Sequence, residues 1–132
     1  MKILAIDYGS KRVGLAIGDT EIGLAFPRGV LKDLSDDEIL QVIVGLVKEE
    51  GLSRVVVGEP ISLSGQVSEQ TKDCQRFANL LSGILSVPVS LQDERLTSRQ
   101  ADTAINQGSP KERDELAAVF LLQSWLDKTP QN

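Results

Sequence analysis

The order of the apolar segments constrains the fold of this 132-residue chain more than any other feature. Three short strand-like segments, residues 3–6, 13–18 and 22–27, begin the chain with only short turns between them. In the second and third, large apolar residues alternate with small ones, which is the period of a β-strand. Successive strands joined by short turns are typical of an antiparallel meander. The chain is therefore expected to begin with three antiparallel strands.

Helical and strand-like patterns alternate after this meander. They predict a helix at 36–50, a strand at 54–58, a helix at 67–85, a strand at 87–92 and helices at 97–107 and 110–126. Strands separated by helices add to one side of a sheet through crossover connections, and the helices then cover its faces. We predict one α/β domain over residues 1–132, a five-stranded mixed sheet with helices on both faces. This is the arrangement of a ribonuclease H-like fold, and other five-stranded α/β sheets share the pattern.

Residue types that are absent or rare in the sequence limit the catalytic and metal-binding sites that the chain can form. The chain has no histidine, so Ser-His-Asp and Cys-His catalysis and the usual histidine-containing zinc sites are excluded. One cysteine, Cys74, cannot form an internal disulfide or a multi-cysteine metal site. No apolar run approaches the length of a membrane span, and the chain does not open with a signal-peptide pattern. We expect a cytoplasmic protein without membrane contact.

Carboxylates stand where the predicted strands end. Asp7 ends the first strand, Glu59 follows the fourth, Asp93 and Glu94 follow the fifth, and Asp114 lies early in the last helix. The carboxyl ends of parallel strands form the ligand crevice of open α/β sheets. Converging carboxylates suit Mg²⁺ or Mn²⁺, and two such ions can promote phosphodiester hydrolysis without a histidine base. Taken one at a time, the position of each acidic residue also has a structural explanation: a turn, a solvated loop or a favourable interaction with a helix dipole.

Four sequence blocks together resemble one known family. Residues 7–16 with Asp19, residues 56–60 with Gly65, residues 93–98 and residues 114–118 are similar, in order and spacing, to motifs of the YqgF (RuvX-like) family. These proteins are pre-16S rRNA nucleases related to Holliday-junction resolvases. The resemblance covers nearly the whole chain.

The resemblance implies a ribonuclease H-like fold with Asp7, Glu94 and Asp114 as the catalytic, metal-binding carboxylates. Two residues depart from the family pattern: Glu59 stands where the family has Leu, and Ser98 replaces a Thr. Because related resolvases carry an acid at the end of the equivalent strand, Glu59 either joins the metal shell or faces solvent. Asp93 is a further candidate ligand.

Basic and hydroxyl residues lie close in sequence to these acids. The predicted nucleic-acid-binding residues are Lys11, Arg12, Arg95, Thr97, Ser98, Arg99 and Arg113. The chain as a whole carries a net charge of −5, which argues against broad, nonspecific binding to nucleic acid. A small basic rim around a metal-occupied acidic pocket would still suit contact with a phosphate backbone. The alternative is that these are solvated surface charges.

The sequence thus predicts an Mg²⁺- or Mn²⁺-dependent endonuclease acting on structured nucleic acid. The resemblance favours processing of the pre-16S rRNA 5′ end in ribosome biogenesis. The alternatives are a Holliday-junction resolvase acting on branched DNA and a noncatalytic nucleic-acid-binding domain. An ATP-binding phosphotransferase of the actin/hexokinase kind also opens with a strand and Asp-x-Gly, but it needs two such domains. The substrate and the oligomeric state, monomer or homodimer, are left open.

Overall fold

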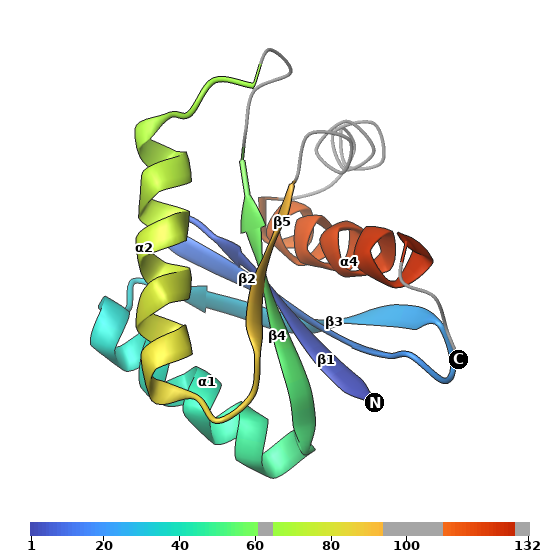
Figure 1. Ribbon diagram of the computed structural model, residues 1–132. Coiled ribbons are helices and arrows are strands. Elements are labelled where there is room, and N and C mark those ends of the chain that lie inside the picture. The colour runs from blue at the N-terminus through green and yellow to red at the C-terminus, as the bar shows by residue number, and fades with distance from the viewer. Residues whose placement is uncertain (61–64, 94–109, 129–132) are drawn as a thin grey trace.

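The computed structural model describes residues 1–60, 65–93 and 110–128 (Figure 1). Its strands and helices are β1 (Lys2–Tyr8), β2 (Arg12–Asp19), β3 (Leu24–Lys32), α1 (Asp36–Glu50), β4 (Leu52–Glu59), α2 (Glu69–Ile84), β5 (Val89–Asp93) and α4 (Pro110–Lys128). The strands form one five-stranded sheet in the order β3-β2-β1-β4-β5. β1, β2 and β3 pair antiparallel, whereas β4 and β5 add in parallel to β1. The predicted mixed sheet is confirmed. The predicted helix at 97–107 lies outside the described residues.

Helices cover both faces of the sheet, as predicted. Successive side chains along β1 and β4 point to opposite faces of the sheet and belong to two separate hydrophobic cores. Leu4, Ile6 and Val57 pack against α1 and α2, while Ile3 and Ala5 pack on the other side against α4. Figure 1 shows α4 on the opposite side of the sheet from α1 and α2. We call these sides the α1/α2 face and the α4 face.

The small residues of β2 lie on the α4 face. A side chain at Gly18 would stand 3.0 Å from Leu122 and 3.1 Å from Leu126, both of α4. Ala16 and Ala118 are completely buried in the same core. The face of β2 that carries its small residues is therefore the one on which α4 packs closely.

Local signals set the ends of the two crossover helices. Ser35 caps α1 and forms a capping box with Glu38, and Gly51 ends the helix with φ 64°. Ser68 caps α2 in the same way. Val67, where the helix is predicted to begin, instead precedes it and is 54% exposed. The helix begins later than predicted because the cap, and not the apolar pattern, defines its start.

The third strand differs from the prediction. It begins at Leu24 rather than Ile22 and continues to Lys32. Asp19 closes a wider turn, since its carbonyl accepts the Gly23 N–H at 2.7 Å and its carboxylate accepts the Glu21 N–H at 2.8 Å. That backbone hydrogen bond from Glu21 holds the pKa of Asp19 below its ordinary value. Asp19, although part of the family-like opening motif, thus stabilises a turn at the far end of β1 and β2 from Asp7.

Candidate active site

Asp7 lies on the α4 face at the carboxyl end of β1. Its side chain follows Ile3 and Ala5 on alternate positions of the strand, and the residue is half-buried. Gly14 of β2 is its antiparallel partner. On its other side, the register that pairs Ile6 with Val57 places Gly58 of β4. Because neither glycine has a side chain, no side chain of β2 or β4 stands beside Asp7 in its row.

Glu59 and Asp93 belong to the opposite face. They are register partners at the ends of β4 and β5. Glu59 accepts a hydrogen bond of 2.7 Å from the side-chain amide of Gln75, which belongs to α2. The structure therefore places Glu59 toward α2 and does not bring it to the side of the sheet on which Asp7 lies.

The β1–β2 turn places two positively charged side chains at the same end of the sheet as Asp7. The Gly9 N–H donates to the Arg12 carbonyl at 3.0 Å, and a side chain at Gly9 would stand only 2.7 Å from that oxygen. Lys11 and Arg12 are exposed on this tight turn. Both are predicted nucleic-acid-binding residues, and the turn sets them within a few residues of the carboxylate.

Helix α2 holds the strand end that carries Asp7. The carbonyl of the next residue, Tyr8, accepts hydrogen bonds from the Gln70 amide at 2.6 Å and from the Cys74 thiol at 3.6 Å. Gln70 and Cys74 lie one turn apart on the helix, so they reach the same carbonyl. Sequence reasoning missed this polar anchor, because it depends on contacts between residues more than 60 positions apart.

The Tyr8 side chain adds a second anchor on the α1/α2 face. Its ring stacks on Phe77 with centroids 4.3 Å apart, and its hydroxyl donates to Asp36 at 2.6 Å. Arg76 donates to the other oxygen of Asp36 at 3.3 Å. Burial, with the hydrogen bond to Asp36, raises the pKa of Tyr8 to about 12.

The raised pKa predicts how stability changes in alkali. Between pH 10 and pH 12 the folded chain keeps a proton that the unfolded chain loses, so the free energy of unfolding should fall by about 2 kcal/mol from this group. Tyr8→Phe should remove that part of the fall and cost about 1 kcal/mol at neutral pH. Denaturant unfolding from pH 7 to 12 measures both. Since Tyr8 is the only tyrosine, phenolate absorbance reports it directly, and a midpoint near 10 in the folded protein would contradict the assignment.

The other predicted site residues lie outside the described part. These are Glu94, Arg95, Thr97, Ser98 and Arg99, and the side chains of Arg113 and Asp114 in the first turns of α4. Within the described ranges, no group of three or more acidic or cysteine side chains is close enough to hold a metal ion. Of the three acids Asp7, Glu94 and Asp114, only Asp7 has a side chain within the described part of the chain. The described ranges also contain no helix long and apolar enough to cross a membrane.

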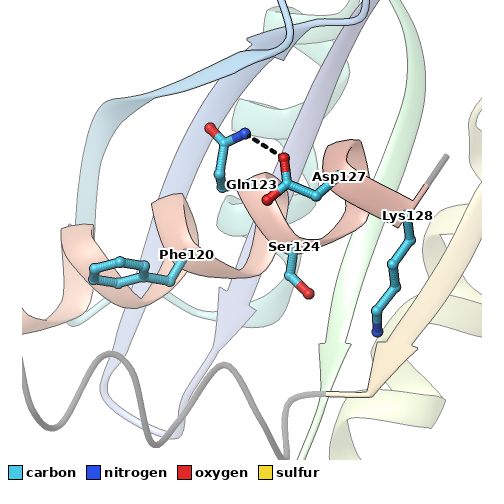
Figure 2. A pocket seen from close by; sticks show the side chains of 5 residues that line it. All are labelled: Phe120, Gln123, Ser124, Asp127 and Lys128. Carbon is cyan, nitrogen blue, oxygen red and sulfur yellow. Dashed lines mark hydrogen bonds between the residues drawn. The ribbon is translucent and has the colours of Figure 1, made fainter. Parts of the chain in front are cut away.

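A surface pocket of about 350 Å³ lies along the last turns of α4, lined by Phe120, Gln123, Ser124, Asp127 and Lys128 (Figure 2). Gln123 donates to the carbonyl of Gly23 and accepts from the N–H of Ala25, at the start of β3. It also donates to Asp127, as the dashed line in Figure 2 shows. These bonds fix α4 to the end of the sheet opposite Asp7, so the pocket is separate from the candidate site.

The arrangement of sheet, helices and strand-end carboxylate defines a class of protein. Thermus thermophilus RuvC in complex with a Holliday junction substrate superposes with a TM-score of 0.63, at 14% identity, over 99% of this chain and 98% of that one. The fowlpox virus Holliday junction resolvase superposes with a TM-score of 0.59, at 14% identity, over 98% of this chain and all of that one. The fold is therefore ribonuclease H-like, of the kind found in resolvases.

Sequence similarity identifies the family. The family model described as "RuvX: Holliday junction resolvase" matches residues 1–128, and the chain belongs to this RuvX family. Relatives from Chloroflexus aurantiacus and Nitrosospira multiformis are 39% and 37% identical, cover 98% and 95% of this chain, and are covered over 89% and 87% of their own length. Both are named "Putative pre-16S rRNA nuclease". The resemblance found in the sequence is confirmed, and with it membership of a family of nucleases.

Proposed function

We propose that residues 1–132 form a single nuclease domain that hydrolyses phosphodiester bonds of structured nucleic acid with the help of Mg²⁺ or Mn²⁺. The observation that carries the proposal is the position of Asp7: a half-buried carboxylate between two glycines, at the strand end where Lys11 and Arg12 are exposed. A carboxylate attracts a divalent cation, and the neighbouring cations attract phosphate.

Asp7, Glu94 and Asp114 would hold the ions. Asp7 fits this role because it lies on the α4 face, and Asp114 belongs to the helix that covers that face. Glu94 directly follows the end of β5 in sequence. Glu59 and Asp93 are left outside the ion site, because Glu59 faces α2 and Asp93 is its register partner.

Other residues of the chain would contact the phosphate backbone and position Asp7. Bound divalent cations supply activation of water and neutralisation of the charge that develops on the phosphate. Lys11 and Arg12 would contact the phosphate backbone, and Arg95, Arg99 and Arg113 extend the proposed contact set. The anchors on the Tyr8 carbonyl and ring would keep Asp7 in a fixed position.

The substitution Glu59→Leu tests the separation of the two faces. Cleavage should stay within about twofold of the wild type, because Glu59 bonds to α2 and not to the ion site. The measurement is the cleavage rate at saturating Mg²⁺, with the melting temperature as a check on folding. A rate reduced by 100-fold in a folded variant would instead place Glu59 in the metal shell.

A cleavage panel tests the proposed function itself. The substrates are a pre-16S rRNA precursor fragment, a linear DNA duplex and a four-way junction, each with Mg²⁺, Mn²⁺ or a chelator. We expect metal-dependent cleavage of the RNA precursor, as the names of the relatives suggest. Cleavage of the junction alone would favour the resolvase alternative, to which the family description points. Binding without cleavage of any substrate would favour a noncatalytic nucleic-acid-binding domain.

A further inference from the structure

Gln92 has a buried polar group with no partner among the described residues. Its side-chain Nε2, near the end of β5, is shielded from solvent and makes no hydrogen bond within the described ranges. Buried amides are nearly always hydrogen-bonded, and a buried donor without an acceptor lowers stability. A chain that keeps such a donor at the edge of its candidate site has a group ready for a ligand that can accept the bond.

Strand register places Gln92 in the same row as Asp7. Its partner on β4 is Gly58, and Gly58 lies beside Asp7 of β1. Two strand spacings separate the backbones of Asp7 and Gln92, which amounts to about 10 Å. Because the residue between them is a glycine, no side chain of the row fills this interval. Asp7 and Gln92 thus lie on either side of Gly58, in one row on the α4 face.

The preceding position on this face of β5 is already occupied by a protein contact. Ser90 accepts a hydrogen bond of 3.0 Å from Arg54, and the Arg54 guanidinium lies 5.8 Å from the centre of the Trp125 ring of α4. The strand is therefore paired with protein groups up to the edge of the site. The unpaired donor comes one position further along the face, toward the strand end.

We propose that the Gln92 amide donates a hydrogen bond to a phosphate oxygen of the nucleic-acid substrate, opposite the Asp7 carboxylate. The inference rests on the proposed nuclease function and adds a substrate-binding residue to it. A neutral amide suits this position because it neither repels the phosphate nor neutralises the carboxylate needed for the cation. Its oxygen and nitrogen ends also fix the orientation of the group it binds.

The test compares Gln92→Leu, which removes the donor at similar size, with Gln75→Leu on the opposite face. Dissociation constants are measured by fluorescence anisotropy for a labelled RNA precursor and a labelled four-way junction, in an Asp7→Asn background that prevents cleavage. Gln92→Leu should weaken binding of the preferred probe about 10-fold or more, with an unchanged or higher Tm. Gln75→Leu loses the bond to Glu59 and should show the reverse, a Tm lower by about 3 °C and unchanged binding.

A third variant, Gln92→Glu, replaces the donor with a negative charge and should weaken binding further than Gln92→Leu. Unchanged affinity in Gln92→Leu, or a loss of Tm comparable to that of Gln75→Leu, would overturn the proposal, since the amide would then serve the fold. Wild-type cleavage of the same probes is the reference. If the wild type neither binds nor cleaves either probe, the proposed nuclease function fails and the role of Gln92 fails with it.

Discussion

The substitution Asp7→Asn should reduce cleavage by about 10³-fold or more while leaving the fold intact. Asparagine keeps the size of the side chain but removes the charge that attracts a divalent cation at the end of β1. Asp7 is half-buried between Gly14 and Gly58, so no neighbouring side chain of its row can take its place. Cleavage rates with Mg²⁺ and Mn²⁺, together with calorimetric binding of Mn²⁺ to the free protein, measure the effect.

The matched control is Asp19→Asn. Asp19 is also an aspartate on the β1–β2 hairpin, but it pairs with Lys2 at the far end, where it accepts hydrogen bonds within its turn. Asparagine can accept the same bonds, so this variant should cleave at the wild-type rate. Full activity in Asp7→Asn, or an equal loss in both variants, would remove Asp7 from the candidate site.

The boundaries of α1 and the order of strands could be predicted because their signals are local. The Ser35 cap with Glu38, and Gly51 at the end of α1, are visible within a few residues of sequence. The start of β3 could not be predicted in this way. Its turn depends on the Asp19 carboxylate and on Gln123, which reaches Gly23 and Ala25 from about a hundred residues away. A prediction from apolar alternation alone therefore starts this strand too early, at Ile22 instead of Leu24.

The sequence does not show on which face of the sheet each acidic residue of the candidate site lies. A strand buried on both sides is apolar at every position, so its pattern does not reveal which residues point the same way. Residues 55–57 are such a run, and nothing in it shows that Glu59 turns toward α2 while Asp7 faces α4. Strand register and the bond from Gln75 decide this. The same register exposes Gln92 as a candidate, although an isolated glutamine carries no signal in sequence.

The fold should be most sensitive to Phe77→Ala, at a cost of about 3–5 kcal/mol in the free energy of unfolding. Phe77 is completely buried on α2 and stacks on the Tyr8 ring, so its loss opens a cavity beneath the strand end that carries Asp7. Such a loss is a large part of the stability of a domain of this size. The expected drop in Tm is more than about 10 °C.

Two further variants separate the cavity from other effects. Leu80→Ala, one helical turn further along α2 at a side chain 43% exposed, should cost less than about 1 kcal/mol. Phe77→Leu keeps most of the volume and should fall between the two alanine variants. If Asp7 depends on the packing of Tyr8 against α2, Phe77→Ala should also slow cleavage at temperatures where it is still folded, whereas Leu80→Ala should not. Equal unfolding free energies for Phe77→Ala and Leu80→Ala would show that Tyr8 and its strand end are held mainly by the hydrogen bonds from Gln70 and Cys74 and to Asp36.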